Sequence, residues 1–197
     1  MKPFIVAKVL QEKRAVALAR WLLGKHLVRR LADGREDARL IVEVEAYNGE
    51  QDQACHARFG RTNRTEVMYR PGGCWYVYLC YGVHEMLNLV VGPAGWPAAI
   101  LIRGVEGAMG PGRVTEALQI DRSLNGTSAT NDTSGLWIED RGIRLPRGCV
   151  KTKPRVGVDY AGRVWATKPW RFVIENPSES TGRPVGGLWT KGRRPAR

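Results

Sequence analysis

The sequence predicts an α+β fold, with a curved and mostly antiparallel β-sheet flanked by helices. Strand-like and helix-like stretches follow one another without the strict alternation that a parallel sheet requires. The 197 residues fit one domain, and no segment of 20 to 50 residues repeats, which excludes a solenoid or a propeller. We expect a single domain over residues 1–175. Residues 176–197, rich in Gly, Pro and Arg, are expected to form a flexible basic tail.

Each element follows from a local pattern. Residues 11–23 carry apolar side chains at helical spacing and end before Gly24. Residues 98–106 are largely apolar on both faces, which favours a central strand. Gly and Pro precede an apolar-periodic run within 109–120, which indicates a loop that leads into a helix. The other expected elements are a strand, turn and strand over 26–47, a polar loop over 48–66, a hairpin around Tyr81-Gly82, and strands at 136–140 and 170–175.

The charge balance points to a polyanionic partner. The chain has 31 Lys and Arg against 19 Asp and Glu, which gives a net charge of +12. Nucleic acid is the first candidate partner and an anionic membrane surface the second. The longest uncharged run, residues 86–102, is interrupted by Gly and Pro, and the N-terminus lacks a secretory signal, so we expect a cytoplasmic protein with no membrane contact.

Neither a metal nor an organic cofactor is expected. The four cysteines show no CxxC spacing, and only three histidines are available. In a reducing compartment the cysteines are interpreted as free thiols.

Glu43 and Glu45 form a pair of carboxylates on one predicted strand. Side chains two residues apart leave a strand on the same side, with their roots about 7 Å apart. One interpretation is an exposed strand whose polar face is acidic. The other is that one carboxylate is buried and activates a water, where it would also stabilise an oxocarbenium-like sugar during cleavage of a glycosidic bond.

An aromatic cluster follows in the predicted hairpin. Tyr76 and Tyr78 share one strand face, whereas Trp75 lies on the other, and Tyr81 precedes the turn glycine. Core packing explains one face, and a tyrosine at a turn can be exposed by chance. Aromatic side chains beside a basic surface are also typical of proteins that stack on unpaired bases or wedge into a duplex.

Several basic residues have two interpretations each. His56 lies in the polar loop and is either a solvated histidine or part of a site. Arginine occurs at every third position at 58, 61 and 64. These side chains are interpreted either as part of a solvated loop or as phosphate contacts. Arg103 ends an apolar strand and could pair with Glu43 or Glu45. The GPGR segment at 110–113 fits either a phosphate contact at a helix N-terminus or a simple helix start.

Taken in order, these motifs resemble those of the alkyladenine (3-methyladenine) DNA glycosylase family. The resemblance runs from about residue 22 to about residue 172. The motifs are EVEAY at 43–47, His56, RTEVMYRPGG at 64–73, YVYLCYG at 76–82, Asn88, LIRGVE at 101–106, GPGR at 110–113, PRVGVDYAG at 154–162 and KPWRF at 168–172. Each is weak alone, but the ordered set is specific.

The resemblance implies a monofunctional enzyme that flips a damaged purine out of duplex DNA and hydrolyses its N-glycosidic bond. Glu45 would activate the water, held also by Arg103 and the carbonyl of Val156. Tyr47, His56 and Tyr78 would sandwich the base. The remaining implied roles are exclusion of guanine by Asn88, a hydrogen bond from the His56 amide to the base, and wedging by Tyr81. Beside the resemblance, Arg58, Arg61, Arg64 and Arg113 stay candidates for contacts with the DNA backbone.

The expected substrates are alkylated or deaminated purines in double-stranded DNA, of the 3-methyladenine, 7-methylguanine, hypoxanthine and ethenoadenine class. The protein is expected to act as a monomer. Trp75, the spacing of 58–66 and the Val-Thr after GPGR depart from the family pattern and bear on lesion preference. Two alternatives stay open: a non-catalytic protein that binds or senses damaged DNA, and a carbohydrate hydrolase, for which a charge of +12 would serve no purpose.

Overall fold

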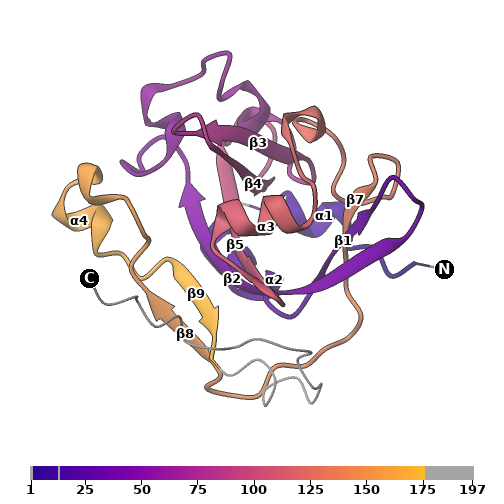
Figure 1. Cartoon of the computed structure of the whole chain (residues 1–197). Coiled ribbons are helices and arrows are strands. Elements are labelled where there is room, and N and C mark those ends of the chain that lie inside the picture. The colour runs from indigo at the N-terminus through magenta and orange to yellow at the C-terminus, as the bar shows by residue number, and fades with distance from the viewer. Residues whose placement is uncertain (1, 13, 176–197) are drawn as a thin grey trace, which may run out of the picture.

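The long strand β2 (Glu36–Asn48) organises the fold, because it pairs with three other strands along its length. The computed structural model describes residues 2–12 and 14–175, and it shows one open sheet of nine strands (Figure 1). The other strands are β1 (His26–Arg30), β3 (Trp75–Cys80), β4 (His84–Val90), β5 (Ala98–Val105), β6 (Ala108–Met109), β7 (Leu136–Glu139), β8 (Val150–Lys153) and β9 (Arg171–Ile174).

The strand order is β3-β4-β5-β2-β1-β7, with β6 beside β5, and β9 between β2 and β8. Every pairing is antiparallel. The α-helices are α1 (Ala7–Leu10), α2 (Ala15–Leu22), α3 (Pro111–Ala117) and α4 (Arg163–Ala166), and the 3-10 helices are η1 (His56–Phe59), η2 (Glu66–Tyr69), η3 (Arg122–Leu124) and η4 (Asp159–Ala161). The predicted fold class, α+β with a mostly antiparallel sheet, is confirmed.

Alternation along the strands gives the sheet two faces with different roles. On β2, Val44 and Ala46 enter the main hydrophobic core, whereas Glu45 and Tyr47 face a cavity on the other side. The neighbouring strands repeat this division. Their core side chains are Trp75, Val77, Leu87, Leu89, Ile100 and Ile102, and their cavity side chains are Tyr76, Tyr78, Met86, Asn88, Ala99 and Leu101.

Two helices close the core. Leu18 and Leu22 of α2, and Val114 and Leu118 at α3, are almost fully buried in the same hydrophobic cluster as the strand residues. Figure 1 shows α3 lying across β4 and β5, and Thr115 of α3 donates a hydrogen bond to the Glu85 carbonyl of β4. The core therefore supports the sheet from one side and leaves the other side free to form a site.

Most elements follow the sequence expectation. The hairpin around Tyr81-Gly82, the central strand β5, the helix within 109–120, and strands β7 and β9 are all present, although that helix (α3) already starts inside the GPGR segment, at Pro111. The helix expected over 11–23 is wrong at its start, because α2 begins only at Ala15. The carbonyl of Leu10, the last residue of α1, instead accepts a hydrogen bond at 2.7 Å from the amide of Gly92, which lies between β4 and β5.

Strand β8 was not expected. Its sequence, VKTK, has two exposed central residues and little apolar character, so its pairing with β9 leaves no pattern in the sequence. The basic tail expected over 176–197 lies outside the described residues. The four cysteines are free thiols.

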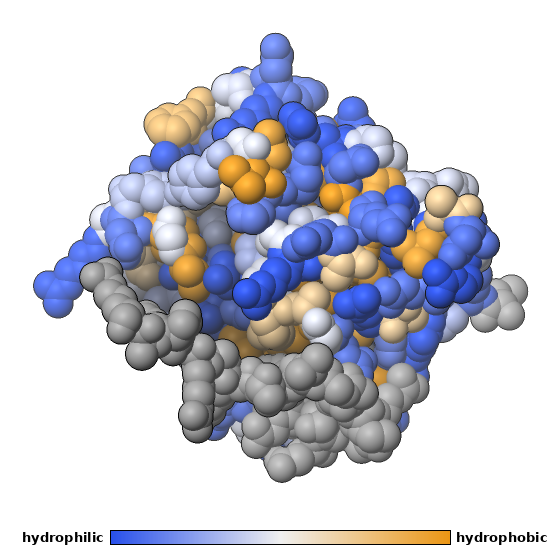
Figure 2. Space-filling view, viewed as in Figure 1, coloured by the Kyte–Doolittle hydropathy of each residue, from blue (hydrophilic) through white to orange (hydrophobic). Residues whose placement is uncertain are grey.

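Hydrophilic side chains cover most of the face shown in Figure 2, with hydrophobic ones scattered among them. Within the part of the chain that the structure describes, no helix is long and apolar enough to cross a membrane. The same residues contain no group of three His, Cys, Asp or Glu side chains that could hold a metal ion.

Candidate active site

A cavity of about 610 Å³ lies on the face of the sheet opposite the core. Strands β2 to β5 form its floor and one wall, and the segments around η1 and η4 complete it. The expected site residues that line it are Glu45, Tyr47, His56, Arg58, Arg64, Tyr78, Tyr81, Asn88, Arg103 and Val156. Arg61 and Arg113 do not line it. Segments far apart in the sequence therefore meet around Glu45.

Glu45 is fully buried, and neighbouring groups fix both of its carboxylate oxygens. The Tyr47 hydroxyl donates to Oε2 at 2.9 Å, and the Val156 amide donates to Oε1 at 2.9 Å. Arg103 Nε lies 3.5 Å from Oε1. Burial raises the pKa of Glu45, and the charge of Arg103 and these hydrogen bonds oppose that rise. Glu45 is therefore a stronger base than a solvated carboxylate, held in one orientation.

Val156 contacts Glu45 through its amide, an interaction that the sequence did not indicate. The water-holding role expected for its carbonyl stays a prediction. Val156 follows Arg155 in the segment between β8 and η4, and that segment lines the cavity up to Tyr160.

His56 and two tyrosines form an aromatic wall. The ring centroids of His56 and Tyr78 are 4.6 Å apart at an interplanar angle of 72°, and those of Tyr76 and Tyr78 are 5.2 Å apart. The Tyr76 hydroxyl lies 3.1 Å from His56 Nδ1. Burial, followed by the charges of Arg64 and Arg58, lowers the pKa of His56 to about 4, so its ring is neutral at physiological pH. Tyr76 holds this wall in place, a role that the sequence did not reveal.

Tyr47 is supported from behind by a buried ion pair. The guanidinium carbon of Arg155 lies 4.8 Å from the centroid of the Tyr47 ring. Arg155 donates to both oxygens of Asp52, at 2.6 and 2.9 Å, and to the Ala46 carbonyl at 2.9 Å. Both side chains of the pair are fully buried. In the sequence these two residues look like ordinary loop charges, and only their contact reveals their role.

Tyr81 projects from the tip of the β3–β4 hairpin. The residue is 95% exposed, and its φ of 51° lies in the left-handed region that a tyrosine seldom adopts. Gly82 also has a positive φ, and the Val83 amide bonds to the Cys80 carbonyl, so the two residues form a tight hairpin turn. Strain of this kind is often retained at functional positions. The turn holds a large aromatic ring in solvent at the edge of the cavity.

Asn88 is almost fully buried in the cavity wall. Its side-chain nitrogen donates to the carbonyls of Tyr76 at 3.2 Å and Met86 at 3.3 Å. These two bonds fix the orientation of the amide, so a ligand entering the cavity meets a rigid polar group there.

The expected arginines differ in their surroundings. Arg58 stacks between the rings of Phe59 and Tyr160, with its guanidinium carbon 4.2 and 4.7 Å from their centroids. Arg64 lies over Tyr78 at 4.9 Å. Within residues 2–12 and 14–175 neither forms an ion pair with a carboxylate. Arg61 instead binds Glu66 through two 2.6 Å hydrogen bonds, and Arg113 is exposed beyond the cavity.

Comparison with known proteins identifies the family. A model of the family described as methylpurine-DNA glycosylase (MPG) matches residues 9–109 and 106–178. A protein of Psychrobacter cryohalolentis, named "Putative 3-methyladenine DNA glycosylase", is 44% identical over 191 residues, with 81% of this chain and 87% of the relative covered. A protein of the same name from an Anaeromyxobacter species is 44% identical, with 90% of this chain and 92% of the relative covered.

A protein from Methanocella arvoryzae carries that name too and is 42% identical, with 90% of this chain and 96% of the relative covered. The matches extend over nearly all of the described residues, including every strand that contributes to the cavity. The chain therefore belongs to the methylpurine-DNA glycosylase family.

Proposed function

We propose that this protein, acting as a monomer in the cytoplasm, removes alkylated or deaminated purines from double-stranded DNA and leaves abasic sites. The substrates are purines of the 3-methyladenine, 7-methylguanine, hypoxanthine and ethenoadenine class. One observation carries the proposal above all. Glu45 is a fully buried carboxylate with a raised pKa at the floor of a cavity walled by Tyr47, His56 and Tyr78.

The reaction needs a water molecule and a side chain that accepts a proton from it. Glu45 accepts a proton from the water, the water oxygen bonds to the sugar C1′, and the N-glycosidic bond breaks with its electron pair leaving on the purine. The carboxylate also stabilises the positive charge that develops on the sugar. A purine methylated at N3 or N7 is already cationic and leaves readily, so base binding and water activation are the main requirements.

The walls suit a flat, electron-poor base. Aromatic faces attract a cation by about 0.5–2 kcal/mol. Because His56 is neutral at physiological pH, it adds no repulsion toward a cationic purine. The base must leave the helix to reach Glu45, and Tyr81 at the cavity edge is placed to fill the gap in the duplex. The rigid Asn88 amide would exclude the exocyclic amine of guanine.

Substitution of Glu45 by Gln tests the proposal. The substrate is a duplex that contains one 7-methylguanine, in buffer with EDTA. We expect the single-turnover rate of base release to fall by about 100- to 10,000-fold, with binding of the duplex retained. Glu66→Gln, which removes an exposed carboxylate bound to Arg61, is the matched control and should release base at the normal rate.

The alternative of a non-catalytic DNA-binding protein has a distinct outcome. If the unaltered protein binds the lesion duplex with a steep salt dependence but releases no base, the enzymatic proposal is wrong and the binding role survives. If Glu45→Gln releases base as fast as the unaltered protein, another group activates the water.

A further inference from the structure

Four charged side chains of alternating sign form a chain that ends at Glu45. Arg171 Nη1 donates to Glu43 Oε1 at 2.9 Å. The same oxygen accepts from Arg103 Nε at 3.1 Å, and that Nε lies 3.5 Å from Glu45 Oε1. Arg103 is thus shared between two carboxylates and lies nearer to Glu43. The chain runs from the partly exposed Arg171 to the fully buried Glu45.

The backbone is shaped to bring Arg103 and Glu43 together. In the β2–β5 ladder, Glu43 pairs with Gly104 and the next residue, Val44, pairs with Ile102, so Arg103 is the extra residue of a bulge. Bulges redirect side chains and are frequent beside active sites. A Cβ atom on Gly104 would lie 3.0 Å from the Glu43 Cβ, so the glycine leaves room for the Glu43 side chain.

Arg171 has a second attachment that also leads to Glu45. Its Nε donates to the Pro154 carbonyl at 2.8 Å. Pro154 begins the segment in which the Val156 amide donates to Glu45. Arg171 therefore contacts both the carboxylate that competes for Arg103 and the backbone that orients Glu45.

We propose that Glu43 and Arg171 are positioning residues. They determine how strongly the Arg103 guanidinium interacts with the Glu45 carboxylate, and thereby the pH range in which Glu45 can accept a proton from water. This inference rests on the proposed function. Arg171 offsets the charge of Glu43, and without it Arg103 would be drawn further toward Glu43. Without Glu43, Arg103 would interact with the carboxylate of Glu45 alone.

Three other groups surround Glu45: the Tyr47 hydroxyl on β2, the Val156 amide, and the Arg155 guanidinium, whose charge is balanced by Asp52. Glu43→Gln removes no contact of these three groups, whereas Arg171→Gln also frees the Pro154 carbonyl in the segment of Val156, and a weaker Val156 hydrogen bond would likewise raise the pKa of Glu45. The charge of Glu43 is among the causes that raise the pKa of Glu45, although burial is the largest. Removing Glu43 should therefore lower that pKa, and removing Arg171 should raise it.

The test is the pH dependence of single-turnover base release from a 7-methylguanine duplex, at saturating protein. This lesion is already cationic, so protonation of the leaving purine does not enter the profile. The acid limb of the profile is the pH range in which the rate falls as Glu45 takes up a proton. We expect Glu43→Gln to shift this limb to lower pH by about 0.5 to 1 pH unit, and Arg171→Gln to shift it to higher pH by a similar amount. Arg171→Lys, which keeps the charge, should stay near the unaltered profile.

Matched controls come from the opposite end of the sheet. Glu36→Gln and Arg30→Gln make the same changes in net charge within an ion-pair network that does not line the cavity, and they should leave the acid limb in place. Duplex affinity, measured at one salt concentration, should be alike in Glu43→Gln and Glu36→Gln.

The outcomes separate this inference from the proposed function. If the unaltered protein releases no base, the proposed function fails. If it releases base but the acid limbs of Glu43→Gln and Arg171→Gln coincide with the unaltered one, or both shift in the same direction, the inference is overturned. Opposite shifts support it, because a merely structural role would lower the rate or the melting temperature without moving the two limbs apart.

Discussion

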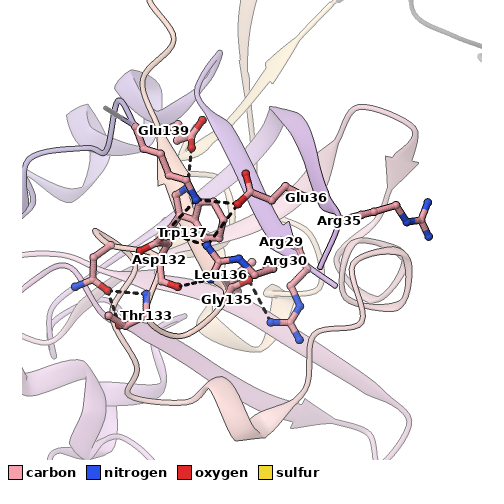
Figure 3. A network of polar contacts seen from close by, with 12 residues as sticks. Arg29, Arg30, Arg35, Glu36, Asp132, Thr133, Gly135, Leu136, Trp137 and Glu139 are labelled. Carbon is pink, nitrogen blue, oxygen red and sulfur yellow. Dashed lines mark hydrogen bonds and ion pairs between the residues drawn. The ribbon is translucent and has the colours of Figure 1, made fainter. Parts of the chain in front are cut away.

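Two ion-pair networks at opposite ends of the sheet have similar geometry but different surroundings. Behind the cavity, Asp52 and Arg155 form hydrogen bonds of 2.6 and 2.9 Å in complete burial. Around Trp137, Glu36 and Asp132 bind Lys2 and Arg30 at similar distances, but these four side chains keep 31 to 38% of their area exposed (Figure 3). The comparison therefore separates the effect of solvent exposure on the stability that an ion pair contributes from the effect of the distance between its charges.

The two networks also differ in what they hold. In the exposed network, Lys2 lies 4.1 Å and Arg30 lies 5.2 Å from the centroid of the Trp137 ring, so the two cations cover a buried side chain of β7. The buried pair instead holds the backbone at Ala46 and packs against the back of Tyr47, both near the end of the cavity strand β2. Water can replace a lost partner in the first network but not in the second. A short ion pair matters most where water cannot reach it.

The largest effect is expected from Asp52→Ala. This change leaves Arg155 buried without its counter-charge, and also removes the acceptors of the Asn48 and Ala54 amides. We expect a loss of about 3–5 kcal/mol in the free energy of unfolding, measured by urea denaturation. Asp132→Ala, its counterpart in the exposed network, should give a curve close to that of the unaltered protein. Equal losses in the two variants would contradict the role assigned to burial.

The same contrast explains what the sequence could predict. Strand alternation correctly placed Glu43 and Glu45 on one side of β2, where both contact Arg103, and the largely apolar run correctly placed β5 at the centre of the sheet. Periodicity is a local property, so local sequence carries it. The predicted helix start at residue 11 was wrong: α1 ends at Leu10, whose carbonyl accepts a tertiary hydrogen bond from Gly92, and α2 begins only at Ala15.

Contacts between distant segments left no such signal. Asp52 and Arg155 are separated by 103 residues, and Arg171 and Glu43 by 128. A charge in a polar loop looks the same in the sequence whether it ends in solvent or in a buried pair. The expected pairing of Arg103 with Glu43 or Glu45 was the exception, since the end of an apolar strand marked its place. The structure resolves that alternative by placing Arg103 against both carboxylates.

A pH titration sharpens the comparison on the cavity side. Burial and the charges of Arg64 and Arg58 lower the pKa of His56 to about 4, whereas an unfolded histidine titrates near 6.5. Below about pH 6.5 the unfolded chain takes up a proton that folded His56 refuses, so stability should fall as the pH drops from 6.5 toward 4. NMR should show the His56 ring neutral from pH 5 to 8, and a ring that titrates near 6.5 would contradict its buried position.

The smallest effect is expected from Glu36→Gln in the exposed network. The Glu36 carboxylate accepts from Lys2 at 2.8 Å, and the pKa of Lys2 is raised by its hydrogen bonds to Glu36 and Asp132. Lys2 and Arg30 both keep Asp132 as a partner after the change, and water can solvate the N–H groups of these two side chains that Glu36 no longer binds. The melting temperature should therefore change little, and 0.5 M NaCl should narrow any difference, because salt screens exposed charges. A loss as large as that of Asp52→Ala would mean that this network, although partly exposed, is as indispensable to the fold as the buried pair.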